Sequence, residues 1–207
     1  VNCVKSLNDN VKILIIENSK KFEHEHFFKK KFPKIKIICS GKNLGYGKAN
    51  NFGLQLTKTN YALILNPDIV CEKNFFRNLS KILSKKVNFS IMGCQYLKDK
   101  VFMPAGYFNS YENETFKEKF YANNIESISK VEWVTGCSML INLKKFKRRK
   151  LFDQNFFLYF EEFDLCKSII DKGENIYTSK YLKIDHLGFQ SSLGNNLENK
   201  DRANRLR

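Results

Sequence analysis

The sequence predicts an α/β fold, a three-layer α/β/α sandwich around a mostly parallel central sheet. Short apolar runs of strand length alternate with segments of helical periodicity along the first half of the chain. Some runs, such as residues 62–65, are continuously apolar, which is typical of strands buried on both faces. Strands that alternate with helices favour a parallel sheet with helices on both sides.

We expect four strands in the first half of the chain, at residues 11–16, 34–39, 62–65 and 89–94. A helical or loop segment through Phe28 separates the first two strands. The second strand leads through a glycine-containing loop, 41–47, into a helix at about 48–57. The helix expected at 73–83 has apolar residues spaced for one buried face.

The second half of the chain is less regular. We expect a strand at 101–108, a polar segment at 109–130 and an interrupted apolar strand at 131–141. A helix follows at about 161–171, and in the segment 184–189 a further strand ends in His186. The pattern predicts a single domain over residues 1–190 and a polar C-terminal tail at 191–207.

The chain is strongly basic, with a formal net charge of +15 that comes mainly from lysine. A dense cluster runs from Lys144 to Lys150. Such a surface favours polyanions: nucleic acid, an anionic membrane face or phosphorylated small molecules. The low share of arginine disfavours nucleic acid, because arginine is the commonest reader of base edges. Alternatively, the lysines only solvate the surface.

The six cysteines include no C-x-x-C pair, and several, such as Cys39, lie within apolar runs. They are expected to be small buried hydrophobes in a reducing compartment. No apolar run reaches the length of a membrane span, and no secretory signal is recognisable. We therefore expect a soluble or membrane-surface protein.

The strand at 62–65 ends in Asn66, Pro67 and Asp68. Proline cannot continue the hydrogen-bond ladder, so the strand must end near Asn66. Ligands of open α/β sheets collect beyond the carboxyl ends of strands, where Asp68 would meet a cation or a polyphosphate. The alternative is an ordinary turn, since all three residue types favour turns.

Three other features are candidates for chemistry. The loop 43–47 opens a helix and lets phosphate or ribose approach closely, although it matches neither G-x-G-x-x-G nor a Walker motif. Glu162 shares an expected inward helix face with Cys166 and Ile169, so it is either a base or an acid favoured by the helix dipole. His186 is either a metal ligand or a structural histidine.

Taken in order, these segments resemble the family 2 glycosyltransferases, most closely the rhamnosyltransferase-like branch that builds bacterial surface polysaccharides. The resemblance covers roughly residues 11–192. The matching motifs lie at residues 13–19, 43–53, 63–68, 131–137, 152–166 and 186–191. Several motifs in one order are far more specific than any single one.

The resemblance implies a GT-A fold and the inverting transfer of a sugar, such as rhamnose, from a dTDP- or UDP-sugar to a lipid-linked or glycan acceptor. Asp68 would hold Mg²⁺ or Mn²⁺ against the donor diphosphate, with His186 as a further ligand or diphosphate contact. The implied donor-binding residues are Glu17, Asn18, Asn43, Gly45, Tyr46, Asn50, Asn66 and Asp68.

The resemblance also assigns the acceptor side. Glu162 falls on the second acid of the family's Glu-Asp pair, the general base for the acceptor hydroxyl, and Glu161 would support it. Trp133 and Gly136 would shape the acceptor site, where an aromatic face can stack on a sugar ring. The enzyme would be cytoplasmic, at the inner membrane face, with the Lys144–Lys150 cluster meeting anionic lipid or the acceptor's diphosphate.

Two departures from the family pattern affect these expectations. Residues 1–7 look like the helix that follows the family's first strand, so that strand is expected to be missing. Either the sequence is a fragment or the nucleotide pocket is incomplete. Glu17 and Glu162 stand where the family has aspartate. A shift of about 1 Å in a catalytic group costs on the order of 100-fold, which predicts weak activity or a compensating pocket.

Two alternatives stay open. A sugar-phosphate nucleotidyltransferase would need a glycine-rich loop with a basic residue after its first strand, and the segment Glu161-Glu162 disfavours it. A non-catalytic basic module derived from a transferase would bind nucleic acid or membrane in a strongly salt-dependent way.

Overall fold

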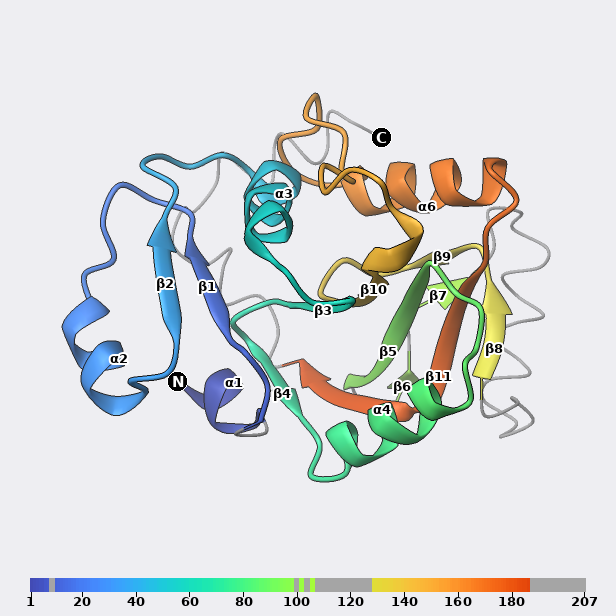
Figure 1. Cartoon of the computed structure of the whole chain (residues 1–207), viewed down its shortest axis with the longest axis horizontal. Coiled ribbons are helices and arrows are strands. Elements are labelled where there is room, and N and C mark those ends of the chain that lie inside the picture. Colours follow the sequence, from blue (N-terminus) through green and yellow to red (C-terminus); the bar gives the residue numbers. More distant parts are fainter. Residues whose placement is uncertain (8–9, 99–100, 103–104, 107–127, 187–207) are drawn as a thin grey trace.

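The computed structural model describes residues 1–7, 10–98, 101–102, 105–106 and 128–186 (Figure 1). In chain order its elements are α1 (Asn2–Lys5), β1 (Leu14–Glu17), α2 (Glu25–Lys31), β2 (Lys36–Cys39), α3 (Tyr46–Leu56), β3 (Tyr61–Leu65), β4 (Ile69–Cys71), α4 (Phe75–Ser84), β5 (Ile91–Lys98), β6 (Val101–Phe102), β7 (Ala105–Gly106), β8 (Ile128–Val131), β9 (Trp133–Val134), β10 (Ser138–Asn142), the 3₁₀ turn η1 (Leu143–Lys145), α6 (Glu161–Asp171) and β11 (Ile176–His186).

The central sheet has the strand order β3-β10-β5-β11-β4, with β6 paired to β5 and β8 paired to β11. Because β10 is antiparallel to both β3 and β5, while β11 is parallel to β5, strands β3, β5 and β11 run in one direction. The α/β class is confirmed, but the sheet is mixed rather than mostly parallel. The regular alternation of helices and strands stops after β5, and β10 enters from the less regular part that follows.

Strands β1 and β2 form a separate parallel pair, in which Leu14 lies opposite Lys36 and Glu17 opposite Cys39. Helix α3 packs on β1, and Gly53 permits this because a Cβ there would lie 3.1 Å from Cγ1 of Ile16. The chain opens in the short helix α1, as expected for residues 1–7. Within the described residues, no strand precedes Leu14.

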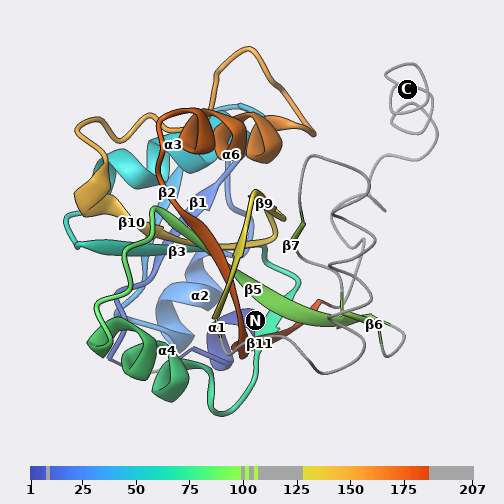
Figure 2. The same ribbon diagram turned by 90° about the vertical axis from the view of Figure 1, so that its right-hand side faces the viewer.

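Helices cover both faces of the central sheet and bury two hydrophobic clusters (Figures 1 and 2). Leu54 of α3 and Leu165 of α6 belong to the cluster on one face. Phe75 and Ile82 of α4 belong to the cluster on the other face. Strand β10 serves both, since Met139 and Ile141 point to the first cluster and Leu140 to the second. The three-layer arrangement is therefore confirmed.

Several expected boundaries change. Strand β4 is a short addition directly after Asp68, and it pairs with the end of β11. The expected strand at 131–141 is divided into the end of β8, β9 and β10, and the expected strand at 101–108 contains two short strands, β6 and β7. Most of the polar segment 109–130, residues 187–189 and the tail 191–207 lie outside the described residues.

Among the described residues, no helix combines the length and the apolar character needed to cross a bilayer.

Candidate active site

Asp68 lies in the tight connection between β3 and β4. The amide of Asn66 donates to the carbonyl of Cys137 at 3.0 Å, and the carbonyl of Asn66 accepts the amide of Ile69 at 3.2 Å. This turn buries Asp68, whose Oδ2 lies 3.3 Å from Nε2 of His186 at the end of β11. The Asn-Pro-Asp segment is thus a turn, and it also brings together two residues that are 118 positions apart.

The surroundings of Asp68 fit a divalent cation. Its Oδ1 is buried and has no hydrogen-bond partner, which is unfavourable for a carboxylate oxygen. Within the described part of the chain, no group of three or more acidic, histidine or cysteine side chains is arranged to hold a metal. Mg²⁺ is commonly bound through one or two carboxylates and completes its shell with phosphate and water, so Asp68, with His186 beside it, suits a cation shared with a diphosphate.

The two acids that open α6 have different surroundings. Glu161 is only 3% exposed, and its Oε2 is buried without a hydrogen-bond partner. Burial raises the pKa of Glu161 to about 7, with a smaller contribution from the charge of Glu162. Burial also raises the pKa of Glu162, which is half-buried. The expected inward face is correct for Cys166 and Ile169, but Glu161 is the more buried of the two acids.

Cys137, in the turn before β10, is joined to the turn of Asp68, because its carbonyl accepts the amide of Asn66 at 3.0 Å. Burial raises the pKa of Cys137 to about 11, and the charges of Asp68 and Glu162 add to this rise. The hydroxyl of Tyr46 donates to the carbonyl of Gly136, the neighbour of Cys137. Burial raises the pKa of Tyr46, and Glu162 contributes next. Gly47, next to Tyr46, lies against Glu161, since a Cβ there would be 3.6 Å from Cβ of Glu161. Residues 136–137 and the start of α3 therefore connect the turn of Asp68 to the acids of α6.

The expected donor-binding residues after β1 and β2 form one hydrogen-bonded loop system. The side-chain amide nitrogen of Asn18 donates to Oδ1 of Asn43 at 3.1 Å and to the carbonyl of Gly45 at 3.3 Å. Oδ1 of Asn18 accepts the backbone amide of Leu44 at 2.8 Å. Oδ1 of Asn43 also accepts the amide of Gly45 at 3.0 Å. Because these side chains are used to hold the loop in one conformation, the backbone of the loop is the part that a ligand would contact.

For the other expected donor-binding residues, Glu17, Asn50 and Asn66, the structure gives contacts within the protein. Glu17 ends β1 half-buried, and its carbonyl accepts the amide of Ser40 at 2.9 Å. The side-chain amide of Asn50 donates to the carbonyl of Tyr46, one turn earlier in the same helix, at 3.1 Å. Asn66 contributes backbone contacts that shape the turn before Asp68.

Trp133 and Gly136, expected on the acceptor side, lie beside the start of α6 and α3. The ring of Trp133 packs on Phe163 with centroids 5.0 Å apart, and Phe163 packs on Phe160 at 6.2 Å. Gly136 is buried, and a Cβ there would lie 3.0 Å from the Tyr46 hydroxyl. Neither Cys137 nor Phe163 was expected at the site from the sequence, because one thiol or one helical aromatic has no distinctive local signal.

The basic cluster begins at the other end of the sheet. Lys144 and Lys145 follow Asn142, which lies opposite Tyr61 at the start of β3, whereas Asp68 follows the end of β3. Lys145 forms an ion pair with Glu174 at 3.0 Å. The start of the cluster is therefore separated from the Asp68 region by the length of β3, which argues against the expected contact with an acceptor's diphosphate.

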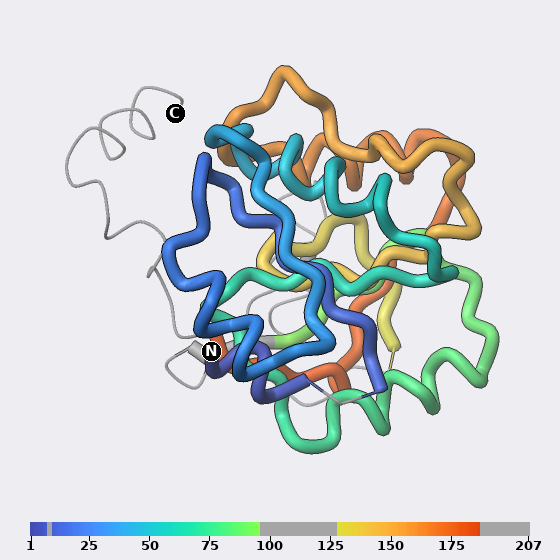
Figure 3. Tube along the Cα trace, turned by 60° about the vertical axis from the view of Figure 1, so that its left-hand side comes forward, coloured from blue at the N-terminus to red at the C-terminus, as the bar shows by residue number. Residues whose placement is uncertain are grey.

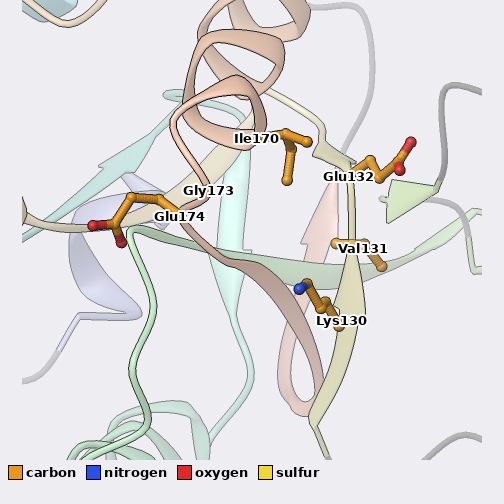
Figure 4. A pocket seen from close by; sticks show the side chains of 6 residues that line it. All are labelled: Lys130, Val131, Glu132, Ile170, Gly173 and Glu174. Carbon is orange, nitrogen blue, oxygen red and sulfur yellow. The ribbon is translucent and has the colours of Figure 1, made fainter.

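A pocket of about 300 Å³ also lies away from Asp68 (Figure 4). Its lining comes from β8, the segment after it and the end of α6: Lys130, Val131, Glu132, Ile170, Gly173 and Glu174. Because Glu161 and Glu162 stand at the opposite end of α6, this pocket is not the candidate active site.

Comparisons with known proteins identify the family. The family described as "Glycosyl transferase family 2" matches residues 1–155. The chain is 29% identical over 155 residues to the rhamnosyltransferase WbbL of Escherichia coli (strain K12), which covers 67% of this chain and 59% of that protein. It is 24% identical over 173 residues to the low-salt glycan biosynthesis hexosyltransferase Agl10 of Haloferax volcanii. That alignment covers 80% of this chain and 55% of Agl10.

The chain thus spans less than two thirds of the length of these two relatives. Among solved structures, it is similar to the crystal structure of GalNAc-T7 with UDP, GalNAc and Mn²⁺, with a TM-score of 0.65 and 12% identity over 89% of this chain and 39% of that chain. That likeness concerns the fold and confirms the expected GT-A architecture. Since the family match covers 155 of the 207 residues, the chain belongs to glycosyl transferase family 2.

Proposed function

We propose that this protein transfers a sugar, with inversion, from a UDP- or dTDP-linked donor to a hydroxyl of a lipid-linked or glycan acceptor on the cytoplasmic side of a membrane. The observation that carries the proposal is that residues 136–137 connect the turn of Asp68 to the start of α3, which lies against Glu161. Asp68 is paired with His186, and Glu162 follows the buried Glu161 at the start of α6. Inverting transfer needs a site for the diphosphate and a base for the acceptor; Asp68 with His186 would serve the first need and Glu162 the second.

On the donor side, Asp68 and His186 would hold Mg²⁺ or Mn²⁺. The cation, when bound, neutralises charge on the departing nucleoside diphosphate. The loop held by Asn18 and Asn43 would present its backbone to the base and ribose, next to the N-terminus of α3. The rhamnosyltransferase relative favours rhamnose as the donor sugar, and the hexosyltransferase relative widens the candidates to other hexoses.

On the acceptor side, Glu162 would take the proton of the acceptor hydroxyl. The oxygen of that hydroxyl forms a bond to the anomeric carbon while the bond from this carbon to the phosphate oxygen breaks, and the electron pair leaves with the nucleoside diphosphate. Trp133, whose ring packs on Phe163 at the start of α6, would offer a ring face to the acceptor sugar. Glu161, the buried residue before the base, would support Glu162.

Donor binding by isothermal titration calorimetry tests this proposal. We expect UDP or dTDP to bind to the wild type only weakly without Mn²⁺, and more tightly with it. Asp68→Asn should remove the effect of Mn²⁺, whereas Asp164→Asn, an exposed acid of α6, should preserve it. Absence of nucleotide binding would contradict the proposal and favour the non-catalytic binding module, while Mn²⁺-independent binding would contradict the metal site.

A further inference from the structure

Four consecutive large apolar side chains are exposed directly before the acids of α6. Phe157, Leu158, Tyr159 and Phe160 are 51%, 41%, 51% and 52% exposed. The other exposed large apolar residues in the described part of the chain, such as Phe27 and Tyr181, stand singly. Single exposed apolar residues are ordinary, but a contiguous exposed patch marks a binding surface for another protein, a ligand or a membrane.

The backbone of this segment is held in an unusual conformation. Tyr159 and Phe160 both have φ of +68°, a left-handed conformation that bulky residues rarely adopt. The base of the loop is anchored, since the amide of Tyr46 donates to the carbonyl of Phe157 at 3.1 Å. Gly45 makes room for this contact, because a Cβ there would lie 2.2 Å from the same carbonyl oxygen. The exposed residues 157–160 therefore form a held projection, which we term the aromatic loop.

Exposed lysines belong to the loops that adjoin the aromatic loop. Lys20 and Lys21 follow β1, and Lys42 follows β2. The carbonyl of Lys21 accepts the hydroxyl of Ser19 at 2.9 Å, and that of Lys42 accepts the hydroxyl of Ser40 at 2.6 Å. The same loops are tied to Gly45 through Asn18. Figures 1 and 3 show the orange segment that leads into α6, which contains the aromatic loop, at the same edge of the molecule as the blue loops after β1 and β2.

We propose that the aromatic loop inserts into the interface of an anionic bilayer while Lys20, Lys21 and Lys42 contact its headgroups. Aromatic side chains next to cations are the combination that binds such interfaces, because the rings gain from burial and the lysines gain from the negative surface potential. The net charge of +15 adds a general attraction. The basic cluster at Lys144 is not needed for this contact, since it begins at the other end of the sheet.

The inference deepens the proposed function and, for its catalytic meaning, rests on it. The aromatic loop leads directly into Glu161 and Glu162. Docking through this loop would place the proposed base close to the level of the headgroups, where the hydroxyl of a lipid-linked acceptor sugar lies. Binding to the bilayer is itself independent of any sugar transfer.

Co-sedimentation of the full chain with vesicles tests the inference. The probes are vesicles of equal parts phosphatidylcholine and phosphatidylglycerol, and vesicles of phosphatidylcholine alone. The double variant Tyr159→Asn/Phe160→Asn removes the rings, and asparagine tolerates a positive φ, so the loop backbone is retained. Phe27→Asn, which removes an exposed ring from α2, is the matched control.

We expect the wild type and Phe27→Asn to bind the anionic vesicles, with a fraction of the binding surviving in high salt because the apolar contact is not screened. The affinity of the double variant for these vesicles should be at least about 10-fold lower than that of the wild type, and its salt-resistant fraction of binding should be lost. Circular dichroism and titration with UDP should show an unchanged fold and unchanged nucleotide binding.

Three results would overturn the inference: no binding of the wild type to anionic vesicles, equal binding by the double variant, or a dimer in light scattering that the double variant abolishes without any vesicle binding. Loss of UDP binding with intact vesicle binding would count against the proposed transfer alone. Vesicle binding that fails while UDP and Mn²⁺ bind normally would count against the membrane contact alone.

Discussion

Two neighbouring carboxylates, Glu161 and Glu162, differ in burial although they share one helical turn. Glu161 is almost fully buried with an unpaired oxygen, whereas Glu162 is half-buried and so remains partly accessible to a substrate. A general base must reach its substrate, and it works best with a pKa raised toward the working pH. Glu162 therefore suits the base, and Glu161 suits a supporting role.

Replacing Glu162 by glutamine should abolish transfer without abolishing donor binding. Glu162→Gln keeps the size of the side chain but cannot accept the acceptor proton, so we expect a loss of transfer on the order of 100-fold or more. Turnover of a nucleotide-sugar donor and UDP or dTDP calorimetry, measured on the same sample, separate the two effects. Asp164→Asn should behave as wild type in both, and an active Glu162→Gln variant would rule out Glu162 as the base.

The pH profile of Glu162 has a defined direction. Because its pKa is raised by burial and the ionised form is the base, the transfer rate should rise as the pH increases through that pKa and then level off. A rate that falls over the same range would contradict this assignment.

Glu161 should make the protein less stable as the pH rises. Its folded pKa of about 7 exceeds the ordinary value of 4.5, so the folded state binds the proton more tightly than the unfolded state does. The free energy of unfolding should thus decrease between about pH 4.5 and pH 7. Glu161→Gln should flatten this slope and raise stability near pH 8 by about 1–3 kcal/mol. Urea denaturation across this range measures it, with Asp164→Asn as the control; an unchanged slope would exclude Glu161 as its source.

One buried side chain of helix α3, Asn51, holds the segment that precedes α6. Asn51 is 1% exposed, and its Oδ1 accepts the amides of Leu151 and Phe152 at 2.7 and 3.0 Å. Its amide donates to the carbonyl of Phe152 at 2.7 Å. Further along, Gly47 lies under Phe152, and the amide of Tyr46 binds Phe157. The first turns of α3 therefore position both the aromatic loop and the start of α6.

Asn51→Ala should destabilise the protein by about 2–4 kcal/mol, because it leaves buried backbone groups of Leu151 and Phe152 without partners. Thermal or urea unfolding measures the loss. Gln55→Ala, one turn later on the exposed side of α3, removes one helix-surface hydrogen bond and should change stability by less than about 1 kcal/mol. Equal effects of the two variants would show that the clamp at Asn51 contributes little.

The candidate active site at Asp68 and the start of the basic cluster at Lys144 lie at opposite ends of β3 and β10. Asp68 lies past the end of β3, and His186 ends β11. Lys144 lies over the ring of Tyr61, at the start of β3. Charges at such a distance are largely screened at physiological salt, where the Debye length is about 8 Å. The two regions should therefore respond independently to substitution.

The double variant Lys144→Gln/Lys145→Gln should leave UDP or dTDP affinity in the presence of Mn²⁺ within about 3-fold of the wild type. Calorimetry of this variant beside Asp68→Asn makes the comparison. A drop as large as that caused by Asp68→Asn would mean that the basic cluster reaches the donor site.

Local patterns were sufficient for many elements of the fold. The apolar run at 62–65 is β3 to within one residue, and the helix expected at 161–171 is α6 with the same bounds. Helix α3 begins two residues earlier than expected, because Gly45 with φ of +79° is its N-cap. The positions of these strands and helices depend on the periodicity of apolar residues or on a single turn, and residues close in the sequence determine both. The roles of the site residues, the single domain over 1–190 and the missing first strand stay predictions.

Contacts between distant residues were decided only by the tertiary structure. Periodicity does not reveal that β10 inserts antiparallel between β3 and β5, that β4 follows Asp68, or that Glu161 rather than Glu162 is the buried acid. The amides of Asn18 and Asn51 likewise have partners that no spacing indicates. The sequence by itself determined which side chains follow which strands. Their distances, burial and pKa values depend on strand pairing and helix packing across a hundred or more residues, which a local pattern does not encode.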